Sequence, residues 1–383
     1  CALPIWLQSN SRVAPNNWTS IFGGSAWEWC KQREEFYLHL FSKKQPDLNW
    51  ENPDLREELF EIMRTWAKRG VDGFRLDVIN FISKKDGFPD VPPNLAHAPE
   101  LHYTCGPKIH DFLQEMHQKV LSNSSLMTVG ETPGVNPEAA ALYCSAKRRE
   151  LDMIFHFEHT SVDHGPLGVW DIAPFRFEEF FAIQSQWQEA MEKTGGWNSL
   201  YLENHDQARF ISRICSEPEL RHLSAGAAAC LLLTLKGTPY IYQGQEIGME
   251  NVAFPKIKDY RDLWSLNHYR ESEERGEKAS SILKRIHYRS RDNSRTPMQW
   301  DESSYAGFST VEPWIKVNPN YQSINVANAE KSSESVLHTY RDLIELRKRD
   351  SVLLQGRFQR LPADQERVFA YLRYQGKIGR AHV

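Results

Sequence analysis

The sequence predicts an α/β protein in which parallel strands and helices form a barrel. The first observation is alternation, because five strand-like apolar runs are separated by segments with helical spacing. The second is that polar and acidic residues stand where several of these runs end, which is where barrel enzymes carry their catalytic groups. The third is that no G-x-G-x-x-G motif follows a strand, so an open doubly wound, nucleotide-binding sheet has little support.

The expected elements follow one another in a regular order. Asn52 and Pro53 can cap and open a helix, and Gly70 can end it. Because helices separate the strands, neighbouring strands are expected to be parallel. The other expected helices cover residues 109–121, 177–192, 225–235 and 334–349, with one more opening at Asn136-Pro137. The expected strands cover residues 71–79, 126–130, 152–157, 199–203 and 238–243.

The two ends of the chain depart from this pattern. Residues 1–50 lack a strand–helix repeat and are rich in Trp, Asn, Ser and Gly, so we expect a loop-rich inserted subdomain there. Residues 51–350 form the predicted barrel domain, and residues 351–376 look like the first strands of a smaller β domain. Residues 377–383 read as a non-native tail. The chain starts at Cys1 rather than Met, so we expect any targeting segment to lie upstream.

Composition excludes several classes of function. A formal net charge of −4 gives no electrostatic basis for binding nucleic acid or an anionic membrane, and no apolar run is long enough to span one. The six cysteines include no C-x-x-C pair, so no metal site is predicted. Scattered thiols favour a reducing compartment, and we expect the cytoplasm. The aromatic content of 12% suits a sugar-stacking site, although it fits a large aromatic core better.

Two strand ends carry acidic residues in patterns that suggest catalysis. In G-F-R-L-D-V (73–78), Arg75 and Asp77 face the same way on a strand, so Arg75 can hold Asp77 ionised, as a nucleophile requires. Glu131 follows M-T-V-G at the next strand end, and these apolar and small neighbours predict a partly desolvated acid with a raised pKa. A structural ion pair at Asp77 and a helix-capping role for Glu131 are the alternatives for each segment alone.

The strand two units later ends in Asn204, His205 and Asp206. His205 can donate to sugar hydroxyls and Asp206 can accept from them, although such a pair alone more often forms a structural hydrogen bond. Three carboxylates at strand ends are expected to meet on one face of a barrel. One can attack an anomeric carbon, another can protonate the leaving oxygen, and the third can stabilise the transition state. Together the three segments therefore predict glycoside hydrolysis.

Several segments resemble the α-amylase superfamily, glycoside hydrolase family 13, and within it the oligo-1,6-glucosidases. The resemblance extends over nearly all of residues 1–375. It implies a (β/α)8 TIM barrel of which residues 51–350 supply strands four to eight. Residues 1–50 would then be the remainder of the inserted subdomain B, and residues 351–376 the start of a truncated C-terminal β domain. The matching segments are G-F-R-L-D-V-I-N (73–80), V-G-E-T-P-G (129–134), E-N-H-D-Q (203–207), G-T-P-Y-I-Y-Q-G-Q-E-I-G-M (237–249) and R-D-N-S-R-T-P-M-Q-W (291–300).

The resemblance implies a role for each matching site residue. Asp77 resembles the nucleophile, Glu131 the general acid/base and Asp206 the transition-state stabiliser. Arg75 and His205 match residues that contact Asp77 and the glucose in subsite −1.

Other matching residues bear on substrate choice. Arg291 and Arg295 resemble the arginines that close the glucose pocket. Val78, directly after the nucleophile, resembles the residue type of α-1,6-specific enzymes, whereas Ala or Thr there resembles maltases. Residues 163–174 lack the R-L-D-R-D run of the related sucrose isomerases, which favours hydrolysis over isomerisation.

The expected activity is retaining hydrolysis of terminal α-1,6-linked glucose from short oligosaccharides such as isomaltose. Maltose, with its α-1,4 linkage, and sucrose are further candidate substrates, and no cofactor is expected. Retention predicts that the carboxyl groups of Asp77 and Glu131 lie about 5–5.5 Å apart. The alternatives are a sucrose isomerase or other transglucosylase, and a non-catalytic, glucosidase-like transporter subunit.

The family pattern is incomplete within these 383 residues. Its first motif, its first barrel strands and the calcium loop of some relatives do not occur here, so any calcium site is expected upstream. Five strands cannot close an eight-stranded barrel, so a protein limited to residues 1–376 is expected to be inactive and to aggregate through open edges. Isomaltose hydrolysis by that fragment at the rate of a full-length relative would contradict this expectation.

Overall fold

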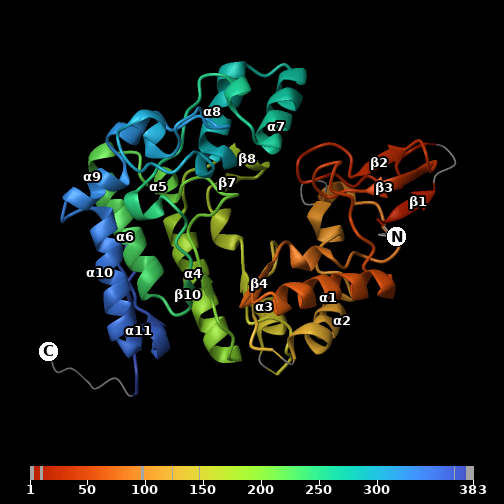
Figure 1. Ribbon diagram of the computed structural model, residues 1–383, viewed down its shortest axis with the longest axis horizontal. Coiled ribbons are helices and arrows are strands. Elements are labelled where there is room, and N and C mark those ends of the chain that lie inside the picture. Colours follow the sequence, from red (N-terminus) through yellow and green to blue (C-terminus); the bar gives the residue numbers. More distant parts are fainter. Residues whose placement is uncertain are drawn as a thin grey trace. The chain divides into compact units, whose positions relative to one another are not determined.

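The computed structural model divides the chain into two compact units, and each is described here by itself. The described residues are 4–8, 12–95, 99–122, 124–145, 147–365 and 367–376, so the expected tail at 377–383 lies outside them. Unit 1 comprises residues 1–158 and 190–197. Unit 2 comprises residues 159–189 and 198–383. Figure 1 labels the helices and several of the strands of the two units.

A parallel three-stranded sheet organises unit 1. It is formed by β4 (Gly73–Leu76), β5 (Met127–Glu131) and β6 (Met153–Phe155), in the order β4-β5-β6. Leu76 lies opposite Gly130 in the register, so the residues that follow them, Asp77 and Glu131, are level at the same edge of the sheet. A side chain on Gly130 would meet Leu151 at 2.6 Å, which explains the glycine beside Glu131.

The helices of unit 1 begin where their capping residues predict. α1 (Pro53–Lys68) opens after Asn52, whose side chain accepts from the backbone N–H of Asp54. α3 (Pro137–Cys144) opens after Asn136 in the same way. Between them, α2 (Ile109–Met116) continues into one π-helical turn, His117–Leu121, which packs against α1.

The N-terminal segment of unit 1 contains a small antiparallel sheet. β1 (Trp6–Gln8), β2 (Trp27–Cys30) and β3 (Glu35–Leu38) pair in the order β1-β3-β2. Its buried aromatic side chains form one hydrophobic cluster with Phe81 and Tyr103, which lie in the long connection after β4. Val78 also packs against this cluster. The N-terminal segment therefore supports the backbone that directly follows Asp77.

Unit 2 holds a second parallel strand pair and most of the helices. β9 (Ser199–Leu200) and β10 (Thr238–Pro239) run parallel, and β7 (His164–Gly165) and β8 (Gly168–Ile172) form an antiparallel pair. In Figure 1, α10 lies along α6, and the two helices are in contact. The helices are α4 (Phe177–Thr194), whose last turn is assigned to unit 1, α5 (Phe210–Ile214), α6 (Arg221–Thr234), α7 (Leu263–Glu274), α8 (Ala279–Arg289), α9 (Val326–Lys331), α10 (Val336–Arg349) and α11 (Ser351–Gln355).

All five predicted strands occur. Four are shorter than expected, while β5 has the expected length but is shifted by one residue, and the predicted parallel pairing holds within each unit. At the other end of the chain, β11 (Arg357–Arg360) and β12 (Tyr371–Tyr374) form an antiparallel pair in the segment expected to begin a β domain. The domain boundaries themselves stay predictions. None of the helices in the described part of the chain has the length and apolar character needed to cross a membrane.

Candidate active site

The end of β4 brings two carboxylates to one arginine. Arg75 and Asp77 are two residues apart, so they share a face at the strand end. Arg75 Nη1 donates to Asp77 Oδ1 at 2.6 Å, and Nη2 donates to Glu131 Oε2 at 2.6 Å. Because a guanidinium holds its donors in a rigid fork, it fixes the two carboxylates relative to each other. The structure thus brings Asp77 and Glu131 together on Arg75. The sequence predicted the Arg75–Asp77 pair and expected Glu131 at the same face.

The two carboxylates differ sharply in exposure. The Asp77 side chain is 69% exposed, whereas that of Glu131 is only 7% exposed. Burial raises the pKa of Glu131 to about 7, and the hydrogen bond and negative charge of Asp77 act in the same direction. Arg75 and the Val78 N–H oppose this rise but do not cancel it. Glu131 therefore keeps its proton close to neutral pH, as a general acid must.

Val78 adopts a strained backbone conformation beside the acid pair. Its φ of 35° and ψ of 44° lie in the left-handed region, which is a rare conformation for a β-branched residue. In this conformation its backbone N–H donates to Glu131 Oε2 at 3.3 Å. The buried Asn80, two residues on, donates to the carbonyl of Pro133 at 2.8 Å and so ties the loop after β4 to the loop after β5.

A second cluster, in unit 2, forms around Asp206. Its Oδ1 accepts from Arg291 Nη1 at 3.2 Å and from Arg295 Nη2 at 2.5 Å, and its Oδ2 lies 3.2 Å from His205 Nε2. Arg295 Nε also donates to the His205 carbonyl at 2.9 Å. The side chains of His205 and Asp206 are 49% and 27% exposed, so both can reach a ligand. Four predicted site residues therefore lie together here.

Asp262 binds the two guanidinium nitrogens of Arg291 that do not contact Asp206. The Asp262 carboxylate accepts from Arg291 Nε at 2.8 Å and Nη2 at 2.6 Å. Burial by itself would raise the pKa of Asp262, but Arg291 and the Ser265 donors hold it below its ordinary value. Asp262 also caps α7, because its side chain accepts from the backbone N–H groups of Trp264 and Ser265. Nothing in the local pattern indicated its ion pair with Arg291, 29 positions along the chain.

Replacing Asp262 by Asn should misplace Arg291 and lower kcat/KM about tenfold or more. The loss corresponds to roughly 1.5 kcal/mol for one charge-assisted hydrogen bond. Asp259→Asn is the matched control, because the Asp259 carboxylate pairs with Lys316 rather than with an arginine of the Asp206 cluster. Steady-state kinetics of the two variants check this expectation. Equal activity of both variants would show that Asp262 does not position Arg291.

The two clusters belong to different units. The first, in unit 1, contains Arg75, Asp77, Val78 and Glu131, and the second contains His205, Asp206, Arg291 and Arg295. The distance predicted between the Asp77 and Glu131 carboxyl groups stays a prediction. Within the described ranges, no group of three or more His, Cys, Asp or Glu side chains is arranged to hold a metal ion.

Comparisons with known proteins identify the family. The α-amylase catalytic domain matches residues 5–356. The chain is 50% identical over 376 residues to an oligo-1,6-glucosidase from Parageobacillus thermoglucosidasius, covering 97% of this chain and 67% of that protein. It therefore spans about two thirds of the length of this relative.

Solved structures agree with this family. A variant of trehalose-6-phosphate hydrolase from Bacillus licheniformis superposes with a TM-score of 0.91 at 42% identity, covering 97% of this chain and 67% of that one. Isomaltulose synthase from Klebsiella sp. LX3 superposes with a TM-score of 0.93 at 37% identity and the same coverage of both chains. The family match, the relatives and the acidic residues at the strand ends all agree. The chain therefore belongs to the α-amylase family of (β/α)8-barrel enzymes and is a glycoside hydrolase of the α-glucosidase type.

Proposed function

We propose that the gene product containing these residues is a retaining α-glucosidase that releases terminal α-1,6-linked glucose from short oligosaccharides. The observation that carries the proposal is the Arg75 guanidinium shared by an exposed and a buried carboxylate. This arrangement suits a pair in which Asp77 attacks and the protonated Glu131 serves as acid. The 50% identity to an oligo-1,6-glucosidase supports the choice of linkage.

The proposed reaction has two steps at the anomeric carbon. First, Glu131 donates its proton to the glycosidic oxygen while an Asp77 oxygen attacks C1, so the bond to the leaving sugar breaks and a glucosyl ester forms. Second, Glu131 removes a proton from a water that attacks C1 and displaces Asp77. Two inversions at C1 release glucose in the α configuration. Carboxylates alone supply this chemistry, so we propose that no cofactor takes part.

The Asp206 cluster is proposed to hold the glucose whose bond is cleaved. Asp206 accepts from two arginines, and these charge-assisted hydrogen bonds fix the orientation of its carboxylate. We assign His205, Arg291 and Arg295 to the sugar hydroxyls and Asp206 to the positive charge that develops on the ring in the transition state.

Hydrolysis assays on four disaccharides test the proposed substrate. Isomaltose should give the highest kcat/KM, ahead of maltose and sucrose, and sucrose should yield glucose and fructose rather than an isomer. Trehalose 6-phosphate belongs in the panel because a trehalose-6-phosphate hydrolase from Bacillus subtilis is 43% identical to this chain. A preference for the phosphorylated sugar, or isomer formation from sucrose, would overturn the α-1,6-glucosidase proposal.

Val78→Thr should shift the preference from isomaltose toward maltose. Val78 is held in the left-handed region beside Asp77 and packs against the N-terminal cluster, so its side chain has little freedom to move away. We expect the ratio of kcat/KM for isomaltose to that for maltose to fall about tenfold, a scale typical of discrimination by one small side chain. The ratio is its own control because it does not depend on the amount of folded protein. An unchanged ratio would show that Val78 does not determine the preference for the α-1,6 linkage.

The proposed compartment is the cytoplasm. The five cysteines among the described residues are all free thiols, which is the state expected in a reducing compartment. Fractionation of the source cells, with the activity followed on isomaltose, tests this location. Recovery of the activity outside the cytoplasm would contradict it.

A further inference from the structure

The loop that carries His205 and Asp206 is closed by a single buried carboxylate. Glu203 stands at the start of this loop, and its Oε1 accepts from Arg209 Nη1 at 2.8 Å. Its Oε2 accepts from the backbone N–H of Phe210 at 2.6 Å. One side chain at the loop entrance therefore binds both residues at the loop exit. Glu203 is 2% exposed and Arg209 is fully buried, so water does not compete for these bonds.

Arg209 connects this loop to the segment after β10. Its Nη1 donates to the Gln243 carbonyl at 2.8 Å, and its backbone N–H donates to Asn251 Oδ1 at 2.8 Å. Its guanidinium also lies over the Tyr242 ring, 5.2 Å from the centroid. Arg209 thus fixes the end of the loop both through its side chain and through its backbone.

The same network reaches the segment that supplies the arginines of Asp206. The Tyr242 hydroxyl donates to the Ser294 carbonyl at 2.8 Å, and the Ser294 hydroxyl donates to the Gln207 carbonyl. Ser294 directly precedes Arg295, whose guanidinium binds Asp206. The loop around Asp206 and the segment around Arg295 are therefore held in register by contacts that begin at Glu203 and Arg209.

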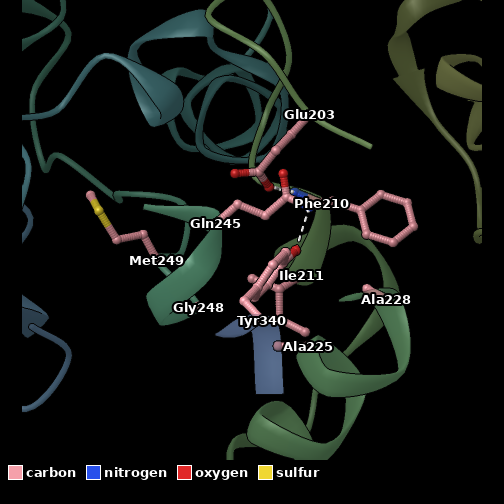
Figure 2. A pocket seen from close by; sticks show the side chains of 9 residues that line it. All are labelled: Glu203, Phe210, Ile211, Ala225, Ala228, Gln245, Gly248, Met249 and Tyr340. Carbon is pink, nitrogen blue, oxygen red and sulfur yellow. Dashed lines mark hydrogen bonds between the residues drawn. The ribbon is translucent and has the colours of Figure 1, made fainter. Parts of the chain in front are cut away.

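The surroundings of Glu203 have no space for a ligand. Figure 2 shows Glu203 above Phe210 and Gln245, with the Tyr340 hydroxyl bound to Gln245 at 2.8 Å. The cavity that these residues line has room for about one water molecule. Apolar side chains close its other walls, among them Ile211 and Met249. The charges of Glu203 and Arg209 therefore act on the protein itself.

A buried ion pair of this kind adds little stability compared with apolar side chains of similar volume. What it supplies is a fixed geometry, because displacing either partner leaves a charge without its counter-ion in a dry environment. We propose that Glu203 and Arg209 are positioning residues that hold the backbone of the 204–209 loop so that Asp206 meets the transition state. This inference rests on the role proposed above for Asp206.

We call the Glu203–Arg209 pair the clamp. The test is a double-mutant cycle between the clamp and Asp206. Glu203→Gln/Arg209→Gln keeps a neutral hydrogen-bonding pair but removes both charges. We expect kcat on p-nitrophenyl α-glucoside to fall about 10- to 100-fold while KM changes less than about threefold, because the loss falls on the transition state. In an Asp206→Asn background, the same clamp substitution should change kcat less than about twofold. An equal fall in both backgrounds would overturn the inference.

Two further variants separate positioning from folding. Glu203→Asp keeps the negative charge but shortens the side chain by one methylene group. This variant should still unfold cooperatively, and its kcat should be lower. Arg347→Gln is the structural control, because Arg347 is also buried but lies outside the Asp206 cluster. Its guanidinium donates to the backbone carbonyls of Leu233, Leu235 and Gly237, which precede β10. It should lower the melting temperature without changing kcat. A folded Glu203→Asp variant with unchanged kcat would contradict the positioning role of Glu203.

Failure of the proposed function gives a different result. If Asp206→Asn itself leaves kcat unchanged, the role of Asp206 is wrong and the clamp has nothing to position. If Asp206→Asn lowers kcat but the clamp substitution acts independently of it, only the positioning role is wrong.

Discussion

Asp77→Asn should lower kcat on isomaltose by at least about 10⁴-fold, because an amide cannot form the glucosyl ester that the two-step reaction requires. The carboxylate and amide side chains are nearly equal in size, so the fold and substrate binding should be retained. Stopped assays of glucose release over hours, combined with isothermal titration of the substrate, measure both quantities.

Asp72→Asn is the matched control for this substitution. Asp72 precedes β4, at the opposite end of the strand from Asp77, and its backbone carbonyl accepts from Met127. Its side chain is not part of the acid pair, so turnover should stay within about twofold of the unmodified protein. If Asp77→Asn also left turnover unchanged, the alternative of a non-catalytic, glucosidase-like binding subunit would gain support.

Glu131→Gln should lower kcat on isomaltose by about 10²- to 10⁴-fold, the range typical of a lost general acid. The loss should be much smaller on α-glucosyl fluoride, because fluoride leaves without protonation. Comparison of the two substrates therefore isolates proton donation from every other role of Glu131. Glu138→Gln, on α3 of the same unit, is the matched control and should leave both rates unchanged.

The pH profile provides a second readout of Glu131. Its pKa is raised to about 7, and only the protonated form can donate to the glycosidic oxygen. The kcat/KM for isomaltose should therefore be highest below pH 7 and fall as the pH rises through about 7. This alkaline limb should be absent from the Glu131→Gln profile. An alkaline limb that persists unchanged in that variant would assign the titration to another group.

The parts of the site that lie close together in sequence were predictable. Arg75 and Asp77 share a face because strand side chains alternate, and the structure shows the expected ion pair. The raised pKa expected for Glu131 follows from the apolar and small residues before it, which place its carboxyl group in a buried position. Parallel strands set the ends of β4 and β5 at the same edge, which accounts for the contact of both carboxylates with Arg75.

Contacts between distant segments were not predictable from local patterns. The ion pair of Asp262 with Arg291 and the clamp of Glu203 on Arg209 depend on how loops pack, and periodicity carries no information on such packing. The left-handed backbone of Val78 has no local signal either, because β-branched residues normally avoid that region.

In α1, apolar residues at helical spacing are not all buried. Ile62 and Trp66 continue the helical spacing of apolar residues, yet they are 55% and 48% exposed. The buried positions of the helix are Leu55 and Phe60, in its first half. A surface helix buries only the part of its apolar stripe that meets a neighbouring element.

The most direct test of the central claim is identification of the residue that carries the covalent intermediate. A fluorinated α-glucosyl fluoride that forms the glucosyl ester but hydrolyses slowly should inactivate the protein, and peptide mass spectrometry should place one sugar on Asp77. An unlabelled protein that still turns over the reagent, or a sugar attached to any other residue, would contradict retaining catalysis by Asp77.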